Sequence, residues 1–134
     1  MQVTERNRQD LWVAATQMVS RAYAPYSRIR VGASLLTDKG SIYAGANVEN
    51  ASYGLTLCAE GAAIAQAVAA EGPSMRLQAI AVASDQPGPL APCGACRQVI
   101  FEFGSEALVI FRGQGSLMEV PITELLPYAF CLSR

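Results

Sequence analysis

Cys58-Ala59-Glu60 and Pro92-Cys93-Gly94-Ala95-Cys96 together supply three thiols and one carboxylate from two short, separated stretches. Three thiolates can hold a zinc ion and leave its fourth position open to water or substrate, whereas a structural zinc site is normally closed by four protein ligands. Zinc held in this way lowers the pKa of a bound water to about 7. Glu60 follows Cys58 closely enough to face that water as a proton carrier. The two stretches therefore predict a catalytic metal centre.

The sequence contains no histidine. Ser-His and Cys-His nucleophilic pairs are therefore excluded, and so is every imidazole metal site. Proton transfer must fall to a carboxylate, a lysine, a tyrosine or a thiol.

Apolar spacing along the chain predicts a single α/β domain over residues 1–134. Three- and four-residue spacings indicate an amphipathic helix over 5–22 with Thr4 as its N-cap, and the alanine-rich stretch 58–70 indicates a buried helix. Helices and strands alternate so as to predict a three-layer α-β-α sandwich around a mixed five-stranded sheet. The other expected elements are strands over 29–36, 42–48, 77–83, 106–111 and 117–120, a helix over 93–103, a helical turn over 122–126, and loops over 51–57 and 85–89.

Both cysteine motifs fall at predicted helix starts. Unpaired backbone N–H groups and the positive end of the helix dipole favour anions there, so thiolates should form readily. Three thiolates and Zn²⁺ sum to a net charge of about −1, which the helix ends would help to offset.

Composition and charge indicate which classes of partner are expected. The 134 residues are 51% hydrophobic and 16% charged, which indicates that other subunits cover part of the surface. The net charge is −1 and there is no basic run, so nucleic acid is not expected as a partner and a free small molecule is. No apolar run reaches the roughly 18 residues of a membrane span, and the polar stretch 1–8 lacks the apolar region of a signal peptide, so we expect a cytoplasmic protein.

Other readings of the cysteines exist. Cys93-x-x-Cys96 alone could be a redox pair, part of a structural zinc site or two core thiols. The added Pro92 and the upstream Cys58-Ala59-Glu60 favour the catalytic site. A four-cysteine site would need Cys131, which lies in an irregular tail without partner spacing and is expected to be a bystander.

The remaining candidates also have simpler interpretations. Glu60 alone could be a first-turn carboxylate favoured by the helix dipole. Asn47 and Glu49 could be polar residues that close a strand, and Tyr53 and Phe130 could be ordinary core or surface aromatics.

A Cys-x-Glu paired with Pro-Cys-x-x-Cys is typical of zinc-dependent nucleobase deaminases. Over almost its whole length the sequence resembles the cytidine deaminases of the small, homotetrameric type. The motifs that carry this resemblance are Tyr26-Ser27, Val31-Gly32-Ala33, the run from Asn47 to Glu60, Pro92 to Gln98, and Glu124-Leu125-Leu126-Pro127.

The resemblance implies one zinc ion per chain on Cys58, Cys93 and Cys96, with metal-activated water attacking C4 of the base. Glu60 would take the water's proton, pass it to N3 and help to protonate the leaving ammonia. The resemblance further implies substrate contacts from Asn47 and Glu49 to ribose hydroxyls, from the Ala59 N–H to the pyrimidine edge, and from Ala51, Tyr53 and Phe130 to active sites shared between the subunits of a homotetramer.

Three departures from that family concern the surroundings of the site. Gly61 replaces an arginine that tempers the charge of the thiolates, which leaves Arg97 or the helix ends to compensate. Ile29-Arg30 replaces a Phe-Pro pair, so Ile29 is expected to loosen or reshape the pocket wall. Strand alternation favours an outward, solvated Arg30.

The sequence thus predicts hydrolytic deamination of cytidine and deoxycytidine to uridine and deoxyuridine, with release of ammonia. The alternatives are the same chemistry on a modified pyrimidine nucleoside or another aminated heterocycle, and a non-enzymatic zinc-binding or redox protein. The preference for ribose or deoxyribose stays open.

Overall fold

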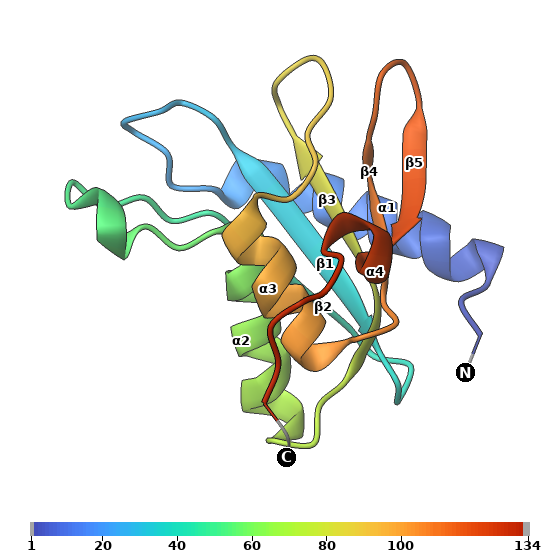
Figure 1. Ribbon diagram of the computed structural model, residues 1–134. Coiled ribbons are helices and arrows are strands. Elements are labelled where there is room, and N and C mark those ends of the chain that lie inside the picture. Colours follow the sequence, from blue (N-terminus) through green and yellow to red (C-terminus); the bar gives the residue numbers. More distant parts are fainter. Residues whose placement is uncertain (1, 133–134) are drawn as a thin grey trace.

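A mixed five-stranded sheet forms the middle layer of the protein, with strand order β2-β1-β3-β4-β5 (Figure 1). The computed structural model describes residues 2–132, so Met1, Ser133 and Arg134 of the predicted 1–134 domain lie outside the described residues. β1 pairs antiparallel with β2 and β3, β4 runs parallel to β3, and β5 runs antiparallel to β4. The strands are β1 (Val31–Thr37), β2 (Ile42–Ala46), β3 (Leu77–Ser84), β4 (Leu108–Arg112) and β5 (Leu117–Pro121).

Helices cover both faces of this sheet. α1 (Glu5–Met18) packs on one face, and α2 (Ala59–Glu71) and α3 (Gly94–Phe103) pack side by side on the other. Successive side chains of β1 point to opposite faces of the sheet. Leu35 lies in the core under α2 and α3, and Leu36 lies in the core under α1. The predicted three-layer α-β-α sandwich is confirmed. The remaining helices are α4 (Ile122–Leu125) and two 3₁₀ turns, η1 (Val19–Arg21) and η2 (Tyr53–Leu55).

Close approach of backbones fixes the position of α2 on the sheet. A Cβ atom added to Gly45 of β2 would lie 2.5 Å from the backbone nitrogen of Ala63 in α2. Only glycine allows this contact without a shift of the helix. Since Cys58 is the N-cap of α2, the same contact fixes where that cysteine lies.

Most predicted boundaries agree with the structure to within a few residues. Thr4 caps α1 through a reciprocal pair of hydrogen bonds with Asn7, as predicted for its N-terminus, but the helix ends at Met18 and not at residue 22. β1 begins at Val31 and not at residue 29, because side chains outside the sheet hold the backbone before it. Asn47 Nδ2 donates to the Ile29 carbonyl, and the Arg30 N–H donates to Asp85.

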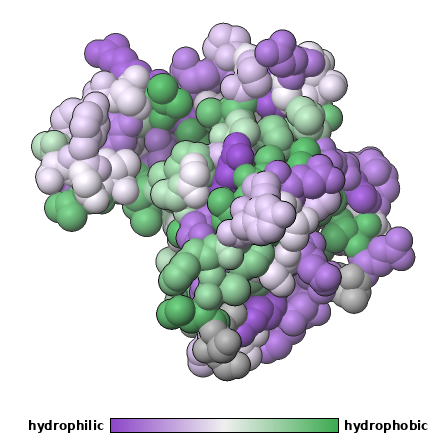
Figure 2. Space-filling view, in the orientation of Figure 1, coloured by the Kyte–Doolittle hydropathy of each residue, from purple (hydrophilic) through white to green (hydrophobic). Residues whose placement is uncertain are grey.

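The expectation that the helix over 58–70 is buried is wrong for one of its faces. Ala59, Glu60, Ala63, Ile64 and Ala67 are buried, but the opposite face is exposed. One layer of sheet can cover only one side of a helix. Figure 2 shows the resulting apolar area over α2, and the exposed residues of this face are Ala65, Gln66, Ala69 and Ala70.

Two further features concern the surface. The segment between β2 and α2 projects away from the body of the molecule and carries η2 (Figure 1). Among the described residues, no helix is long and apolar enough to cross a membrane.

Candidate functional site

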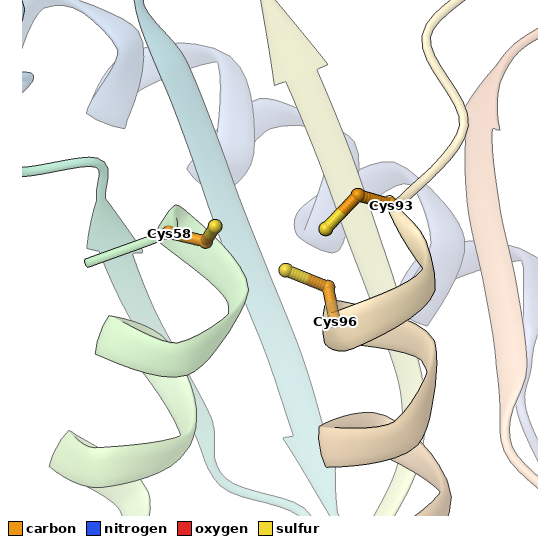
Figure 3. Close-up of side chains that lie close together, drawn as sticks. All are labelled: Cys58, Cys93 and Cys96. Carbon is orange, nitrogen blue, oxygen red and sulfur yellow. The ribbon is translucent and has the colours of Figure 1, made fainter. Parts of the chain in front are cut away.

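The starts of α2 and α3 lie at the same end of the sheet and bring the two cysteine motifs together. Cys58 is the N-cap of α2, Cys93 is the N-cap of α3, and Cys96 lies in the first turn of α3. Both caps have the extended backbone typical of an N-cap, with ψ of 154° at Cys58 and 169° at Cys93. Figure 3 shows the three sulfur atoms pointing into the space between the two helices.

The three sulfur atoms fit a metal ion. They lie within 4.8 Å of one another, and all three cysteines are free thiols. Thiolates at the usual Zn–S distance around a tetrahedral zinc lie about 3.8 Å apart, which is compatible with this spacing. Within residues 2–132 the cluster holds Cys58, Cys93 and Cys96 without Cys131, so it is a three-ligand site.

Hydrogen bonding between the thiols shifts the pKa values of Cys58 and Cys96 in opposite directions. The thiol of Cys96 donates to Cys58 and lowers the pKa of Cys58 to about 7. The same bond, together with burial, raises the pKa of Cys96. Cys58 therefore carries the first thiolate of the cluster.

Glu60 is the carboxylate of the site. It is the second residue of α2 and is only 4% exposed. Burial removes water from the carboxylate and raises its pKa, an effect partly opposed by its own backbone N–H and by the thiol of Cys96. A carboxyl group with a raised pKa can hold or release a proton closer to neutral pH.

A pocket of about 190 Å³ opens onto the cluster. Its wall is mostly apolar, and its polar groups converge at the cysteines and Glu60, as is usual for a small-molecule site. The lining residues are Val31, Asn47, Thr56, Cys58, Ala59, Glu60, Val82, Leu90, Ala91, Cys93 and Cys96.

The structure brings six of the predicted site residues to this pocket: Asn47, Cys58, Ala59, Glu60, Cys93 and Cys96. Glu49 is buried and does not line the pocket; its carboxylate accepts hydrogen bonds from the backbone N–H groups of Tyr26 and Ser27. Four other predicted residues, namely Ile29, Ala51, Tyr53 and Phe130, are exposed and do not line the pocket within the described chain.

Sequence reasoning missed five lining residues. Leu90 and Ala91 directly precede Pro92-Cys93, and Thr56 lies two residues before Cys58, so their proximity to the motifs could have identified them. Val31 and Val82 come from β1 and β3, and only the pairing of these strands brings them to the site.

Arg97 binds carbonyl groups beside the metal cluster. Its Nε donates to the Pro92 carbonyl at 2.7 Å, and its Nη1 donates to the Leu125 carbonyl at 2.9 Å. Arg97 therefore ties the residue before Cys93 to the end of α4. Its predicted role of tempering the charge of the thiolates is left as a prediction.

The departures at Gly61 and Arg30 have different surroundings. A Cβ atom at Gly61 would meet only Leu57 Cδ1, at 3.5 Å, so the position has room for a side chain. Arg30 is exposed and lies near Asp85, whose pKa is lowered first by a hydrogen bond from Gln86 and, to a smaller extent, by the Arg30 charge. This placement agrees with the predicted outward orientation of Arg30.

Comparisons with known proteins bear on the same residues. Residues 5–112 match the family model described as the cytidine and deoxycytidylate deaminase zinc-binding region. A cytidine deaminase of Halalkalibacterium halodurans is 48% identical over 126 residues, which are 92% of this chain and 94% of that protein. A blasticidin-S deaminase of Bacillus cereus is 29% identical, over 90% of each chain.

Solved structures give the same result for the fold. The crystal structure of cytidine deaminase from Burkholderia pseudomallei is 46% identical and superposes with a TM-score of 0.83, covering 91% of this chain and 98% of that one. The cytidine deaminase of Mycobacterium tuberculosis is 42% identical, with a TM-score of 0.83 over 94% of this chain and 98% of that one.

Proposed function

Because the chain belongs to the cytidine and deoxycytidylate deaminase family, we propose that it hydrolyses cytidine and deoxycytidine to uridine and deoxyuridine with release of ammonia. The observation that carries this proposal is the convergence of three thiols, with sulfur atoms within 4.8 Å of one another, and a buried glutamate on one pocket.

Cys58, Cys93 and Cys96 would hold one zinc ion per chain. When bound, zinc acts as a Lewis acid and makes water acidic enough to ionise near neutral pH. The starts of α2 and α3 supply partial positive charge beside the thiolates, and Arg97 adds a full positive charge one residue after Cys96.

Glu60 would move the protons. As a base it accepts the proton of the attacking water, and it passes this proton to N3 of the pyrimidine while oxygen adds to C4. It then takes the second proton of the former water from the hydroxyl at C4 and, as an acid, delivers it to the amino group at C4, so the C4 carbonyl forms, the C–N bond breaks and ammonia leaves. A raised pKa favours a carboxyl group that must both take up and release a proton in one cycle.

The pocket would bind the nucleoside through residues around this centre. The Ala59 N–H and Glu60 would hold the pyrimidine edge, and Asn47 and Glu49 would hold the sugar hydroxyls. Ala51 and Tyr53 project on the segment before α2, and Phe130 is 69% exposed, so these three would complete the site of a neighbouring subunit in a homotetramer. Ile29 would form the outer wall.

The cellular setting follows from the same chemistry. Three thiols must stay reduced to bind a metal, and a reducing compartment such as the cytoplasm keeps them so. A net charge of −1 favours a free nucleoside over a nucleic acid as substrate.

A second candidate substrate has one observation in its favour. The relative named blasticidin-S deaminase matches 90% of this chain at 29% identity. The same hydrolysis could therefore act on a modified pyrimidine nucleoside or another aminated heterocycle. The exposed Ile29 is the residue at which a bulkier substrate would be accommodated.

The experiment combines zinc analysis with an absorbance assay on cytidine, deoxycytidine, 5-substituted cytidines and free bases. We expect one zinc per chain and turnover of both simple nucleosides. Glu60→Ala should keep the zinc and lose at least about a thousandfold in kcat, because it removes the only carboxyl group that lines the described pocket. A zinc-loaded protein inert towards every aminopyrimidine would refute the enzyme and leave a non-enzymatic zinc protein.

A further inference from the structure

Two side chains that follow β2 hold the segment before β1 in place. Asn47 Oδ1 accepts the Val31 N–H and its Nδ2 donates to the Ile29 carbonyl, each at 2.9 Å. Glu49 Oε1 accepts the N–H groups of Tyr26 at 3.0 Å and Ser27 at 3.1 Å. The segment 26–31 is therefore bound at four backbone groups by the two residues proposed to bind the sugar.

Ser27 completes this arrangement with its hydroxyl. The hydroxyl donates to Glu49 Oε2, the oxygen that the backbone does not reach, and accepts the Ile29 N–H at 3.0 Å. Arg28, between these residues, has a φ of 61°, an uncommon conformation for a residue with a side chain. In this turn the Ser27 hydroxyl therefore bonds both the Glu49 carboxylate and the backbone of Ile29.

The Glu49 carboxylate keeps limited capacity for a ligand. It is 8% exposed, and the Ser27 hydroxyl, followed by the two backbone N–H groups, holds its pKa below the ordinary value despite partial burial. A carboxylate has about four acceptor sites, and three are used here, so one is left for a further donor. The direction of that free site depends on how the carboxylate is rotated. The two backbone N–H groups hold Oε1, and the hydroxyl of Ser27 holds Oε2.

We propose that Ser27 is a positioning residue, which orients the Glu49 carboxylate towards a sugar hydroxyl of the nucleoside. This inference rests on the proposed function, in which Glu49 and Asn47 bind the sugar. Without the hydroxyl, Glu49 Oε2 loses its donor and the carboxylate can turn about its last torsion. Binding of a nucleoside with sugar hydroxyls then weakens, whereas binding of one without them does not.

The test compares Ser27→Ala and Ser27→Thr with the unchanged protein. Cytidine and 2′,3′-dideoxycytidine serve as substrates, and kcat and KM are measured for each. Calorimetric titration with uridine and 2′,3′-dideoxyuridine measures binding without turnover. Ser74→Ala is the matched control, because this exposed serine lies beyond the other end of α2 from the cysteines.

We expect Ser27→Ala to raise KM for cytidine and weaken uridine binding by about tenfold, the effect of one hydrogen bond to a charged group. The values for the dideoxynucleosides should change less than twofold, and Ser27→Thr, which keeps the hydroxyl, should restore those for cytidine and uridine. Equal losses with both kinds of sugar, or no loss with either, would overturn the positioning role. If the unchanged protein deaminates neither substrate, the proposed function fails, and the uridine titration still decides the role of Ser27.

Discussion

Glu60 combines burial with charge in a way that costs stability. Only 4% of the residue is exposed, and it lies beside the thiols of Cys58 and Cys96, of which Cys58 ionises first. Placing a carboxylate there removes its hydration, and without the metal the partial positive charge at the start of α2 replaces only part of the lost stabilisation. The geometry needed for proton transfer therefore opposes folding of the metal-free chain.

Glu60→Gln should consequently stabilise the metal-free protein, in a pH-dependent way. The pKa of Glu60 is raised above 4.5 by folding, so the folded state binds more protons than the unfolded one, and the stability of the unchanged protein falls as pH rises through this range. Glutamine has no such titration. After treatment with a chelator, the difference in melting temperature in favour of Glu60→Gln should grow as the pH rises above 4.5. A difference that shrinks with pH would show that burial does not raise this pKa.

The sequence was enough to identify the metal residues but not the surroundings of Glu49. Cys58 and Glu60 lie two positions apart and Cys93 and Cys96 three, so the spacing within each stretch makes it recognisable as a metal-site motif. The hydrogen bonds from Ser27 to Glu49 join residues 22 positions apart. Such partners become evident only after the turn at Arg28 and the end of β2 have been placed beside each other.

At the scale of the elements, the site depends on two helix starts that the sheet holds at one end. Strand and helix types followed from apolar composition and periodicity, because a helix packs one face on the sheet whereas the central strands are apolar towards both helix layers. The residues at which the elements begin and end could not be predicted in the same way, because side chains from distant segments replace the regular backbone hydrogen bonds there. The backbone before Val31 bonds to the side chains of Asn47, Ser84 and Asp85.

Gly45→Ala tests whether the zinc site depends on the position of α2 against β2. The added methyl would lie 2.5 Å from the Ala63 nitrogen and 2.8 Å from Ala62, so α2 must move away from β2. We expect a loss of about 1–3 kcal/mol in the free energy of unfolding, as for other overpacked sites. Weaker zinc retention in competition with a chelator should accompany it, because Cys58 begins the displaced helix.

Gly54→Ala is the control for this change. A Cβ atom at Gly54 would meet nothing within 4 Å, so this substitution should leave both the free energy of unfolding and zinc retention unchanged. If Gly45→Ala destabilised the fold but kept full zinc affinity, the position of α2 on the sheet would not control the metal site.

At the scale of the whole molecule, apolar surface lies where the described chain leaves it uncovered. Tyr53 is 74% exposed and Leu55 71% exposed on the projecting segment, and the outer face of α2 is rich in alanine (Figure 2). A sequence that is 51% hydrophobic predicted covered surface of this kind, but composition alone could not place it.

Complementation between inactive variants tests whether subunits share active sites. Glu60→Ala removes the proton carrier. Phe130→Ala removes an aromatic side chain from a residue that is 69% exposed and therefore packs little against its own chain. We expect each variant alone to be impaired. When both are co-expressed with different tags and purified as mixed oligomers, a site with an intact Glu60 can receive Phe130 from a neighbour, so activity should return. Glu60→Ala mixed with Cys58→Ala is the control and should stay inactive, because one chain holds both residues. A monomeric mass by native mass spectrometry with full activity would contradict the shared site.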